Sequence, residues 1–176
     1  MTHRFVPAIV LLTSVLATLT GLASSVRADS DDDDDFIVTI RSDNGLCLDV
    51  ERHSQDKGAN IIVYRCHGED NQRWDLTAAG RESDWFTAES VDSGLCLDIK
   101  GASSARGTEL IQWPCKRKDR DNQLFEFLPA SRWSRTGEIR VKHTNLCLDA
   151  GRDEDRAKVT QRTCDGSDDQ QWTISR

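Results

Sequence analysis

Leu46-Cys47-Leu48-Asp49 is the stretch that decides the fold, because the chain contains it three times. The same four residue types return as Leu95-Cys96-Leu97-Asp98 and as Leu146-Cys147-Leu148-Asp149. The first cysteines of successive copies are 49 and 51 residues apart. A fixed period of this length is typical of a repeat architecture. We therefore divide the chain from Phe36 onward into three equivalent units.

Each copy of the stretch is followed by a second cysteine, and then by a glutamine that precedes an aromatic residue by two positions. The second cysteines are Cys66, Cys115 and Cys164, and the glutamine–aromatic pairs are Gln72 with Trp74, Gln123 with Phe125, and Gln170 with Trp172. A turn-forming pair such as Asn44-Gly45 precedes each copy. The units therefore share their turns and their apolar positions as well as their cysteines.

Short β-branched or alternating runs, separated by polar turns, predict four strands in each unit, and no window shows a helical stripe. The expected strands lie at 36–41, 47–50, 61–66, 74–77, 85–89, 96–99, 110–113, 125–128, 139–143, 147–150, 159–164 and 172–174, with a loop at 129–137. Four short strands have too little apolar surface to be stable alone. We expect an all-β domain in which three units share one core, with the motif aromatics facing it and the motif glutamines bonding backbone.

The six cysteines, two per unit, predict a disulfide framework rather than a metal site. Metal-binding cysteines usually stand two to four residues apart, whereas the spacings within these units are 19, 19 and 17 residues. If the units are treated alike, each is either closed on itself or linked to the next. We expect no bound metal and no other cofactor.

The first 28 residues predict a secretory signal peptide. No charged residue lies between Phe5 and Val26, and Val26-Arg27-Ala28 places small or aliphatic residues where a signal peptidase requires them. Cleavage after Ala23 and retention as an uncleaved membrane anchor are the alternatives. Cleavage after Ala28 would give a secreted, extracellular protein without membrane insertion, in a compartment that favours disulfides.

The acidic charge of the chain is concentrated in residues 29–35, which contain six aspartates and predict a solvated linker. A calcium site there would need a shaped loop, which this segment lacks. From Phe36 onward the chain has 21 basic and 24 acidic residues, a net charge of −3. Nothing in this balance suggests binding to nucleic acid.

The first unit resembles a repeat of the ricin B-type lectin domain. The resemblance rests on the Cys-Leu-Asp element, the run from Gly58 to Cys66 and the sequence Asn71-Gln72-Arg73-Trp74, and it extends in register over residues 36–176. It implies a β-trefoil, which is a six-stranded barrel capped by three hairpins. It also implies one disulfide within each repeat, and binding of carbohydrate, often galactose-type sugars.

The resemblance also implies which residues form the sugar sites of the first two repeats. In this family a carboxylate accepts hydrogen bonds from sugar hydroxyls, an aromatic ring stacks on the sugar, and an amide adds a further bond. The matching residues are Asp49, Tyr64, Asn71 and Gln72 in the first repeat, and Asp98, Trp113, Asn122 and Gln123 in the second.

The chain departs from the family pattern at several of these positions. Ile62 and Ile111 replace a polar residue that often precedes the stacking aromatic by two positions. In the third repeat Asp149 is kept, but Arg162 replaces the aromatic and Asp169 replaces the asparagine. We therefore expect the third repeat to be structural only.

Two functions remain open at this point. The chain is either a stand-alone secreted lectin or a glycan-binding accessory subunit with a protein partner, such as a secreted enzyme or a toxin. A protease inhibitor on the same scaffold would need an exposed binding loop, which the sequence does not identify. We expect no catalysis, because His53, His67 and His143 lack a serine or cysteine partner in a catalytic motif.

Overall fold

The computed structural model describes residues 36–151 and 154–176, so the expected signal peptide and acidic linker lie outside the described residues. The described chain forms twelve strands and five single-turn 3-10 helices, with no α-helix. No helix in these two ranges is long and apolar enough to cross a membrane. The all-β prediction is therefore confirmed.

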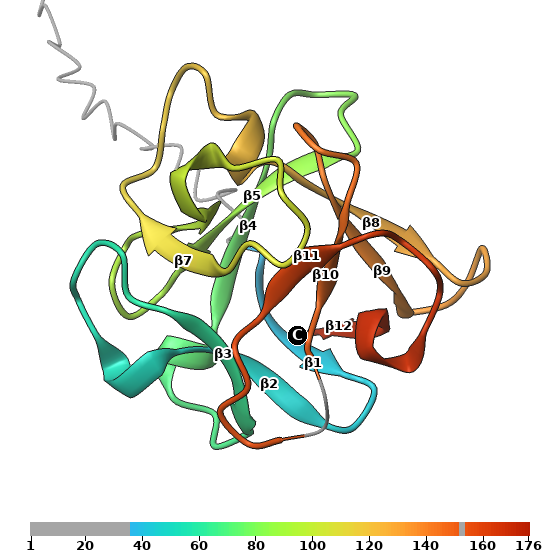
Figure 1. The fold of residues 1–176 in the computed structure, drawn as a ribbon, viewed down its shortest axis with the longest axis horizontal. Helices are drawn as coiled ribbons and strands as arrows, with labels where there is room; N and C mark the ends of the chain where they lie inside the picture. The colour runs from blue at the N-terminus through green and yellow to red at the C-terminus, as the bar shows by residue number, and fades with distance from the viewer. Residues whose placement is uncertain (1–35, 152–153) are drawn as a thin grey trace, which may run out of the picture. The chain divides into compact units, whose positions relative to one another are not determined.

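The strands follow the three units. The first unit contains β1 (Ile37–Ser42), β2 (Leu46–Val50), β3 (Ile61–Arg65) and β4 (Trp74–Ala78); the second contains β5 (Trp85–Ser90), β6 (Cys96–Ile99), β7 (Leu110–Trp113) and β8 (Phe125–Pro129); the third contains β9 (Thr136–Val141), β10 (Cys147–Asp149), β11 (Thr160–Arg162) and β12 (Trp172–Ser175). Figure 1 shows the three units, from cyan through yellow to red, arranged around a common centre.

Six of the strands close into a barrel. β1 pairs with β4, β4 with β5, β5 with β8, β8 with β9, β9 with β12, and β12 returns to β1, where Ile40 faces Ile174. Closure leaves no unpaired sheet edge within this ring. The remaining strands form the hairpins β2–β3, β6–β7 and β10–β11. This is the β-trefoil that the family resemblance implied.

The motif aromatics meet in the barrel core, as predicted. Trp74, Phe125 and Trp172 are all fully buried. Trp74 Nε1 donates to Leu48 O and Trp172 Nε1 donates to Leu148 O, each at 3.1 Å. A buried indole needs such an acceptor, because its N–H loses water on burial. The Cys-Leu-Asp element thus supplies the partner of the motif tryptophan in the first and third repeats.

Each disulfide lies within one repeat: Cys47–Cys66, Cys96–Cys115 and Cys147–Cys164. This result decides between the two pairings that the cysteine count left open, and it agrees with the family resemblance. Each bridge joins the start of the first strand of a hairpin to the segment that follows its second strand. Every repeat therefore has its own crosslink, and no disulfide among the described residues joins two repeats.

Buried glutamines join neighbouring repeats in place of crosslinks. Gln112 Nε2 donates to Ser54 O at 2.7 Å and to Asp56 O at 2.9 Å. One repeat later, Gln161 Nε2 makes the corresponding bonds to Ser103 O and Ala105 O, at 2.8 and 3.0 Å. Both glutamine residues are fully buried. Each therefore satisfies carbonyl groups in the loop of the preceding repeat.

Two strands of the third repeat differ most from the sequence prediction. β9 begins at Thr136, three residues before the expected start, so part of the expected loop at 129–137 is strand. Gly137 permits this early pairing, since it opposes Pro129 and Trp172 and a Cβ atom there would lie 2.1 Å from Leu128 O. Strand β11 is shorter than the expected 159–164 and spans Thr160–Arg162.

Candidate functional site

Each hairpin contains one aspartate, and the motif glutamine of the same repeat donates a hydrogen bond to that aspartate. The glutamines end the 3-10 turns η2 (Asp70–Gln72), η4 (Asp121–Gln123) and η5 (Asp168–Gln170). Their Nε2 atoms donate to Asp49, Asp98 and Asp149 Oδ2 at 2.8, 2.8 and 3.3 Å. All three aspartates are buried. The same spatial relation therefore recurs in every repeat.

Gln72 and Gln123 are themselves only 1% and 0% exposed. Gln72 Nε2 also donates to Arg65 O, and its Oε1 accepts from the backbone N–H of His67. Gln123 bonds Pro114 O and the N–H of Lys116 in the same way. The expected bonds from glutamine to backbone are present. The family resemblance assigned both glutamines to sugar binding, and in the structure both are bonded to the site carboxylates and to backbone.

The two asparagines also lie beside the carboxylates but have different partners. Asn71 Nδ2 donates to Asp49 Oδ2 at 3.0 Å and to Val50 O at 3.1 Å. Asn122 Nδ2 donates to Ile99 O at 3.3 Å, while its Oδ1 accepts from Lys116 Nζ at 2.8 Å. Asn71 Oδ1 is buried and has no hydrogen-bond partner among the described residues.

The second repeat brings its predicted carboxylate and ring into one hollow. Asp98, Trp113, Ile111 and Lys116 are among the residues that line a cavity of about 440 Å³. Trp113 ends β7 and is 36% exposed, whereas Ile111 is almost fully buried. Lys116 Nζ lies 3.4 Å from Asp98 Oδ2. An exposed ring, a buried acceptor and a cation therefore face the same space.

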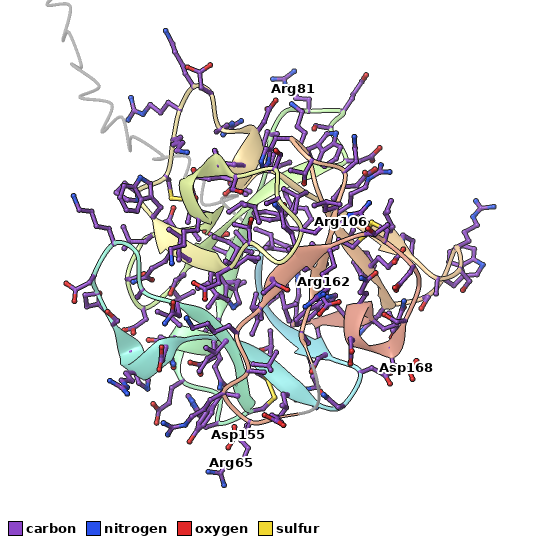
Figure 2. The ribbon with its side chains drawn as sticks, in the orientation of Figure 1. Arg65, Arg81, Arg106, Asp155, Arg162 and Asp168 are labelled. Atoms are coloured by element: carbon purple, nitrogen blue, oxygen red, sulfur yellow. A yellow bond between two sulfur atoms is a disulfide. The ribbon has the colours of Figure 1, made fainter. Side chains whose placement is uncertain are left out.

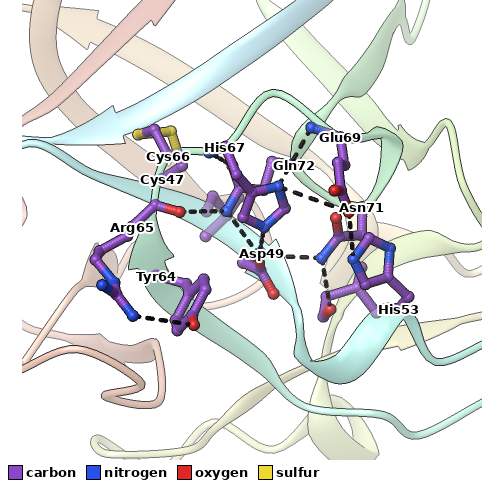
Figure 3. Close-up of polar contacts among 12 residues, drawn as sticks. Cys47, Asp49, His53, Tyr64, Arg65, Cys66, His67, Glu69, Asn71 and Gln72 are labelled. Atoms are coloured by element: carbon purple, nitrogen blue, oxygen red, sulfur yellow. Dashed lines mark hydrogen bonds and ion pairs between the residues drawn. A yellow bond between two sulfur atoms is a disulfide. The ribbon is translucent and has the colours of Figure 1, made fainter.

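The first repeat forms a corresponding cavity of about 380 Å³, lined by Asp49, Tyr64 and Asn71. Its walls also include His53, His67, Glu69 and Arg156, which the sequence analysis did not assign to a site. Figure 3 shows His67 directly beside Asp49, with 3.5 Å between His67 Nε2 and Asp49 Oδ2. One sequence signal was available, because His67 and Lys116 each follow the second cysteine of their repeat directly.

Cationic groups lie against both site aromatics. The guanidinium carbons of Arg65 and Arg156 lie 5.6 and 5.3 Å from the Tyr64 ring centroid. Hydrogen bonds from Arg156 and from Arg65 lower the pKa of the Tyr64 hydroxyl. Arg65 is held by Asp155, with 3.4 Å between Nε and Oδ2, and the two residues are adjacent in Figure 2. Among the described residues, the cation over the Trp113 ring is Lys57, whose Nζ lies 5.6 Å from the ring centroid. The Tyr64 ring is therefore more crowded by cations than the Trp113 ring.

Burial raises the pKa of both site aspartates above the ordinary value. For Asp98 the hydrogen bond from Gln123 and the charge of Lys116 oppose this effect. For Asp49 the bond from Gln72 and the charges of His67 and His53 do so. Such carboxylates are strong hydrogen-bond acceptors when charged, and they have already lost much of their water. The arrangement is suited to accepting bonds from ligand hydroxyls.

In the third repeat, two groups of the protein itself contact the carboxylate of Asp149. Arg162, labelled in Figure 2, places its Nε 3.5 Å from Asp149 Oδ1, and the backbone N–H of Gly151 donates to the same oxygen at 3.0 Å. Arg162 opposes Cys147 as Tyr64 opposes Cys47 and Trp113 opposes Cys96, so an arginine takes the place of the aromatic ring. The expectation that this repeat is structural stays a prediction, and this arrangement supports it.

Comparisons with known proteins place the domain in a family. Residues 84–176, more than half of the chain, match the family described as the ricin-type beta-trefoil lectin domain. Residues 26–113 match a related description, the ricin-type beta-trefoil lectin domain-like family. No curated protein matches the chain.

Three solved structures illustrate the similarity. ThreeFoil, a designed 3-fold symmetric protein, is 30% identical at a TM-score of 0.73, over 81% of this chain and 99% of its own. The ricin B-like lectin of Macrolepiota procera, solved with lactose, is 26% identical at a TM-score of 0.64, over 80% and 94% of the two chains.

The exo-beta-1,3-galactanase 1,3Gal43A of Clostridium thermocellum is 26% identical at a TM-score of 0.71. The match covers 78% of this chain but only 29% of the galactanase chain. The similarity to this enzyme is thus restricted to one part of it. The family match, the β-trefoil and the lectins among the similar structures agree. The chain therefore belongs to the ricin-type β-trefoil lectin family, whose domains bind carbohydrate.

Proposed function

We propose that this protein is a secreted lectin that binds galactose-type or related glycans through its second and first repeats and catalyses no reaction. The observation that carries the proposal is the second-repeat cavity. There the buried Asp98 carboxylate, held by Gln123, and the exposed Trp113 ring face the same space. A sugar has the complementary groups, since its hydroxyls donate hydrogen bonds and its C–H face is apolar.

In this site Asp98 would accept bonds from two neighbouring hydroxyls. Hydrogen bonds to charged groups contribute about 1.5–3 kcal/mol each, so this carboxylate sets the orientation of the sugar. Trp113 would cover the apolar face of the ring. Lys116 Nζ, which already bonds Asn122 Oδ1, offers a further donor at the edge of the cavity. The preference for galactose-type sugars rests on the family and on the Macrolepiota procera lectin, which was solved with lactose.

The first repeat would bind more weakly. Tyr64 offers a smaller ring than Trp113, and Arg65 and Arg156 already lie against it. Asp49 is held as firmly as Asp98, by Gln72 and Asn71. The difference between the two repeats therefore lies in the stacking surface and not in the acceptor.

A second candidate function is that of a glycan-binding accessory subunit. It is favoured by the similarity to one part of a galactanase, which is a larger chain. Purification of the secreted protein from its native source distinguishes the two functions. A stable partner present in stoichiometric amount supports the subunit, and a lone chain supports the lectin.

A glycan array with the secreted chain tests the proposal. We expect binding to glycans that end in galactose-type sugars, and a strong reduction, to the weaker binding of the first repeat, in the Asp98→Asn, Trp113→Ala double variant. Arg162→Ala serves as the control, because it alters an arginine beside the corresponding aspartate of the third repeat. If the parent chain binds no glycan, or if the double variant binds like the parent, the proposed site is wrong.

A further inference from the structure

Two histidines and a glutamate converge at the first-repeat cavity. Glu69 Oε2 lies 2.8 Å from His53 Nε2 and 3.9 Å from His67 Nδ1. The three ligand atoms all lie within 4.8 Å of one another, and the three residues are exposed to solvent. His53 ends the 3-10 turn η1 (Glu51–His53), while His67 and Glu69 lie between β3 and η2. Figure 3 shows both imidazole rings next to Glu69.

The second nitrogen of each imidazole lies close to another carboxylate. His67 Nε2 is 3.5 Å from Asp49 Oδ2, and His53 Nδ1 is 3.6 Å from Asp92 Oδ2. Metal-binding histidines almost always have such a partner, which holds the proton on one nitrogen and leaves the lone pair of the other for the metal. The outer partners of a metal site are therefore present at both histidines.

Asp92 adds an independent observation. It lies in the turn after β5, so it belongs to the second repeat, and its Oδ2 atom is buried. That atom has no hydrogen-bond partner among the described residues. A buried carboxylate oxygen without a partner is costly, whereas a firm bond from His53 Nδ1–H would satisfy it. A cation held by His53 Nε2 would strengthen this bond by making the ring a better donor.

We propose that His53 Nε2, His67 Nδ1 and Glu69 Oε2 form a binding site for a divalent transition metal, with Zn²⁺ as the best match. Zn²⁺ binds histidine nitrogen and carboxylate oxygen at about 2.0–2.2 Å in a tetrahedron, whose ligand atoms are then roughly 3.3–3.6 Å apart. The distances from Glu69 Oε2 to the two imidazole nitrogens, 2.8 and 3.9 Å, bracket this range, so small side-chain rotations bring them into it. Sites with three protein ligands leave a fourth position for water.

Metal binding would change two existing contacts. Zn²⁺ would replace the proton shared between His53 Nε2 and Glu69 Oε2. It would also displace the backbone N–H of Glu69, which donates to His67 Nδ1 across 3.3 Å. Both contacts are at the surface, where water can take over the released groups. The evidence for the metal site does not depend on sugar binding, although the metal site shares the first-repeat cavity and Asp49 with the proposed sugar site. The proposal departs from the expectation from the sequence that the chain holds no metal.

The other repeats lack these ligands. Ala102 ends the 3-10 turn η3 (Lys100–Ala102) in the place of His53, and Lys116 follows Cys115 in the place of His67. In the third repeat Asp165 follows Cys164. Two further groups that include cysteines are unsuitable, because Cys96 and Cys115, like Cys147 and Cys164, are joined in disulfides and offer no thiolate.

Calorimetric titration with Zn²⁺ tests the proposal on the whole secreted chain, produced without a histidine tag. An excess of Mg²⁺ masks the acidic segment 29–35, since Mg²⁺ prefers oxygen ligands. We expect one Zn²⁺ per chain. His53→Ala and His67→Lys, which introduce the residues of the second repeat, should abolish this binding, as should Glu69→Gln. Asp92→Asn should weaken it by about 10–100-fold, as loss of an outer partner does.

His143→Ala is the matched control, because this histidine contacts Ser103 O in another part of the fold. Melting curves confirm that each variant is folded, and imidazole NMR signals of the parent chain give a readout that needs no variant. Zn²⁺ should shift the signals of His53 and His67 but not that of His143. Equal Zn²⁺ binding by the parent chain and by His53→Ala and His67→Lys would overturn the proposal. So would a shift confined to other histidines, or no Zn²⁺ binding at all.

Discussion

Gln123 Nε2 donates to Asp98 Oδ2 across 2.8 Å, and both side chains are buried. Gln123→Leu leaves this carboxylate without its principal donor and also removes two bonds to backbone. We expect a loss of about 1–3 kcal/mol in the free energy of unfolding, the usual cost of an unsatisfied buried group. Sugar affinity should fall as well, because Asp98 is no longer held in place. Chemical denaturation and sugar titration measure the two effects.

Gln55→Leu is the control for this experiment, because Gln55 is exposed and makes one long bond to His53 O. It should leave both quantities unchanged. A Gln123→Leu protein with the stability of the parent chain would show that the Gln123–Asp98 bond does not support the fold.

Trp113→Ala should reduce sugar binding more than any other aromatic substitution in the sites. The exposed indole supplies the stacking face of the second repeat, and aromatic platforms of this kind contribute on the order of 1–3 kcal/mol. Tyr64→Ala should cost less, and Arg162→Ala almost nothing. Thermal stability should barely change in any of the three. If Trp113→Ala binds like the parent chain but melts much earlier, the indole is a packing residue and the site assignment fails.

Trp74→Ala should have the opposite effect, with a large loss of stability. The indole is fully buried, and its Nε1 satisfies Leu48 O. Removing a large buried aromatic side chain costs about 3–5 kcal/mol. Sugar affinity at the second repeat should persist wherever the protein is still folded. A melting curve beside a sugar titration checks this, and a thermally unchanged variant would contradict the shared core.

Sugar binding by the second repeat should weaken as the pH falls. Burial raises the pKa of Asp98 above its ordinary value of 3.8, so protonation begins at a higher pH than for an exposed aspartate. The protonated group is a weaker acceptor, and affinity is lost as the pH falls through the raised pKa. The stability of the fold should show the opposite pH dependence, because Asp98 ionises less readily in the folded chain than in the unfolded chain. Its contribution to the free energy of unfolding declines as the pH rises from the ordinary pKa through the raised pKa.

Lys116→Met makes this prediction specific. The charge of Lys116 opposes the effect of burial, so its removal should raise the pKa of Asp98 further and move the loss of binding to higher pH. Sugar titrations of both proteins over a range of pH measure the shift. An identical pH dependence in the two proteins would show that protonation of Asp98 does not cause the loss of sugar binding at low pH.

N-terminal sequencing of material from the culture medium should begin at Asp29. This prediction follows from Val26-Arg27-Ala28 and from the charge-free run that precedes it. A cell-bound product that still begins at Met1 would favour a membrane anchor. A start directly after Ala23 would keep secretion but move the cleavage site.

Most of the architecture could be read from the sequence, because its signals are local and occur three times. Twelve short strands and the buried motif aromatics follow from patterns within single repeats, whereas the acceptors Asp49 and Asp98 were expected from the family resemblance. The cysteine spacing left two disulfide pairings open, and both the similar loop sizes of the bridges within repeats and the family resemblance favoured that pairing. The exposed Trp113 beside Asp98 was also expected from that resemblance alone.

The tertiary structure decided whatever depends on contacts between repeats or between loops. Barrel closure brings Ile40 against Ile174, and Gln112 reaches Ser54 O across 58 residues of sequence. In the same way, His53 meets Glu69 from its own repeat and Asp92 from the next. No local pattern encodes such meetings, because the three-dimensional packing of the repeats determines which loops become neighbours. The sequence by itself thus determined the repeat and its core, while packing determined the surroundings of each carboxylate.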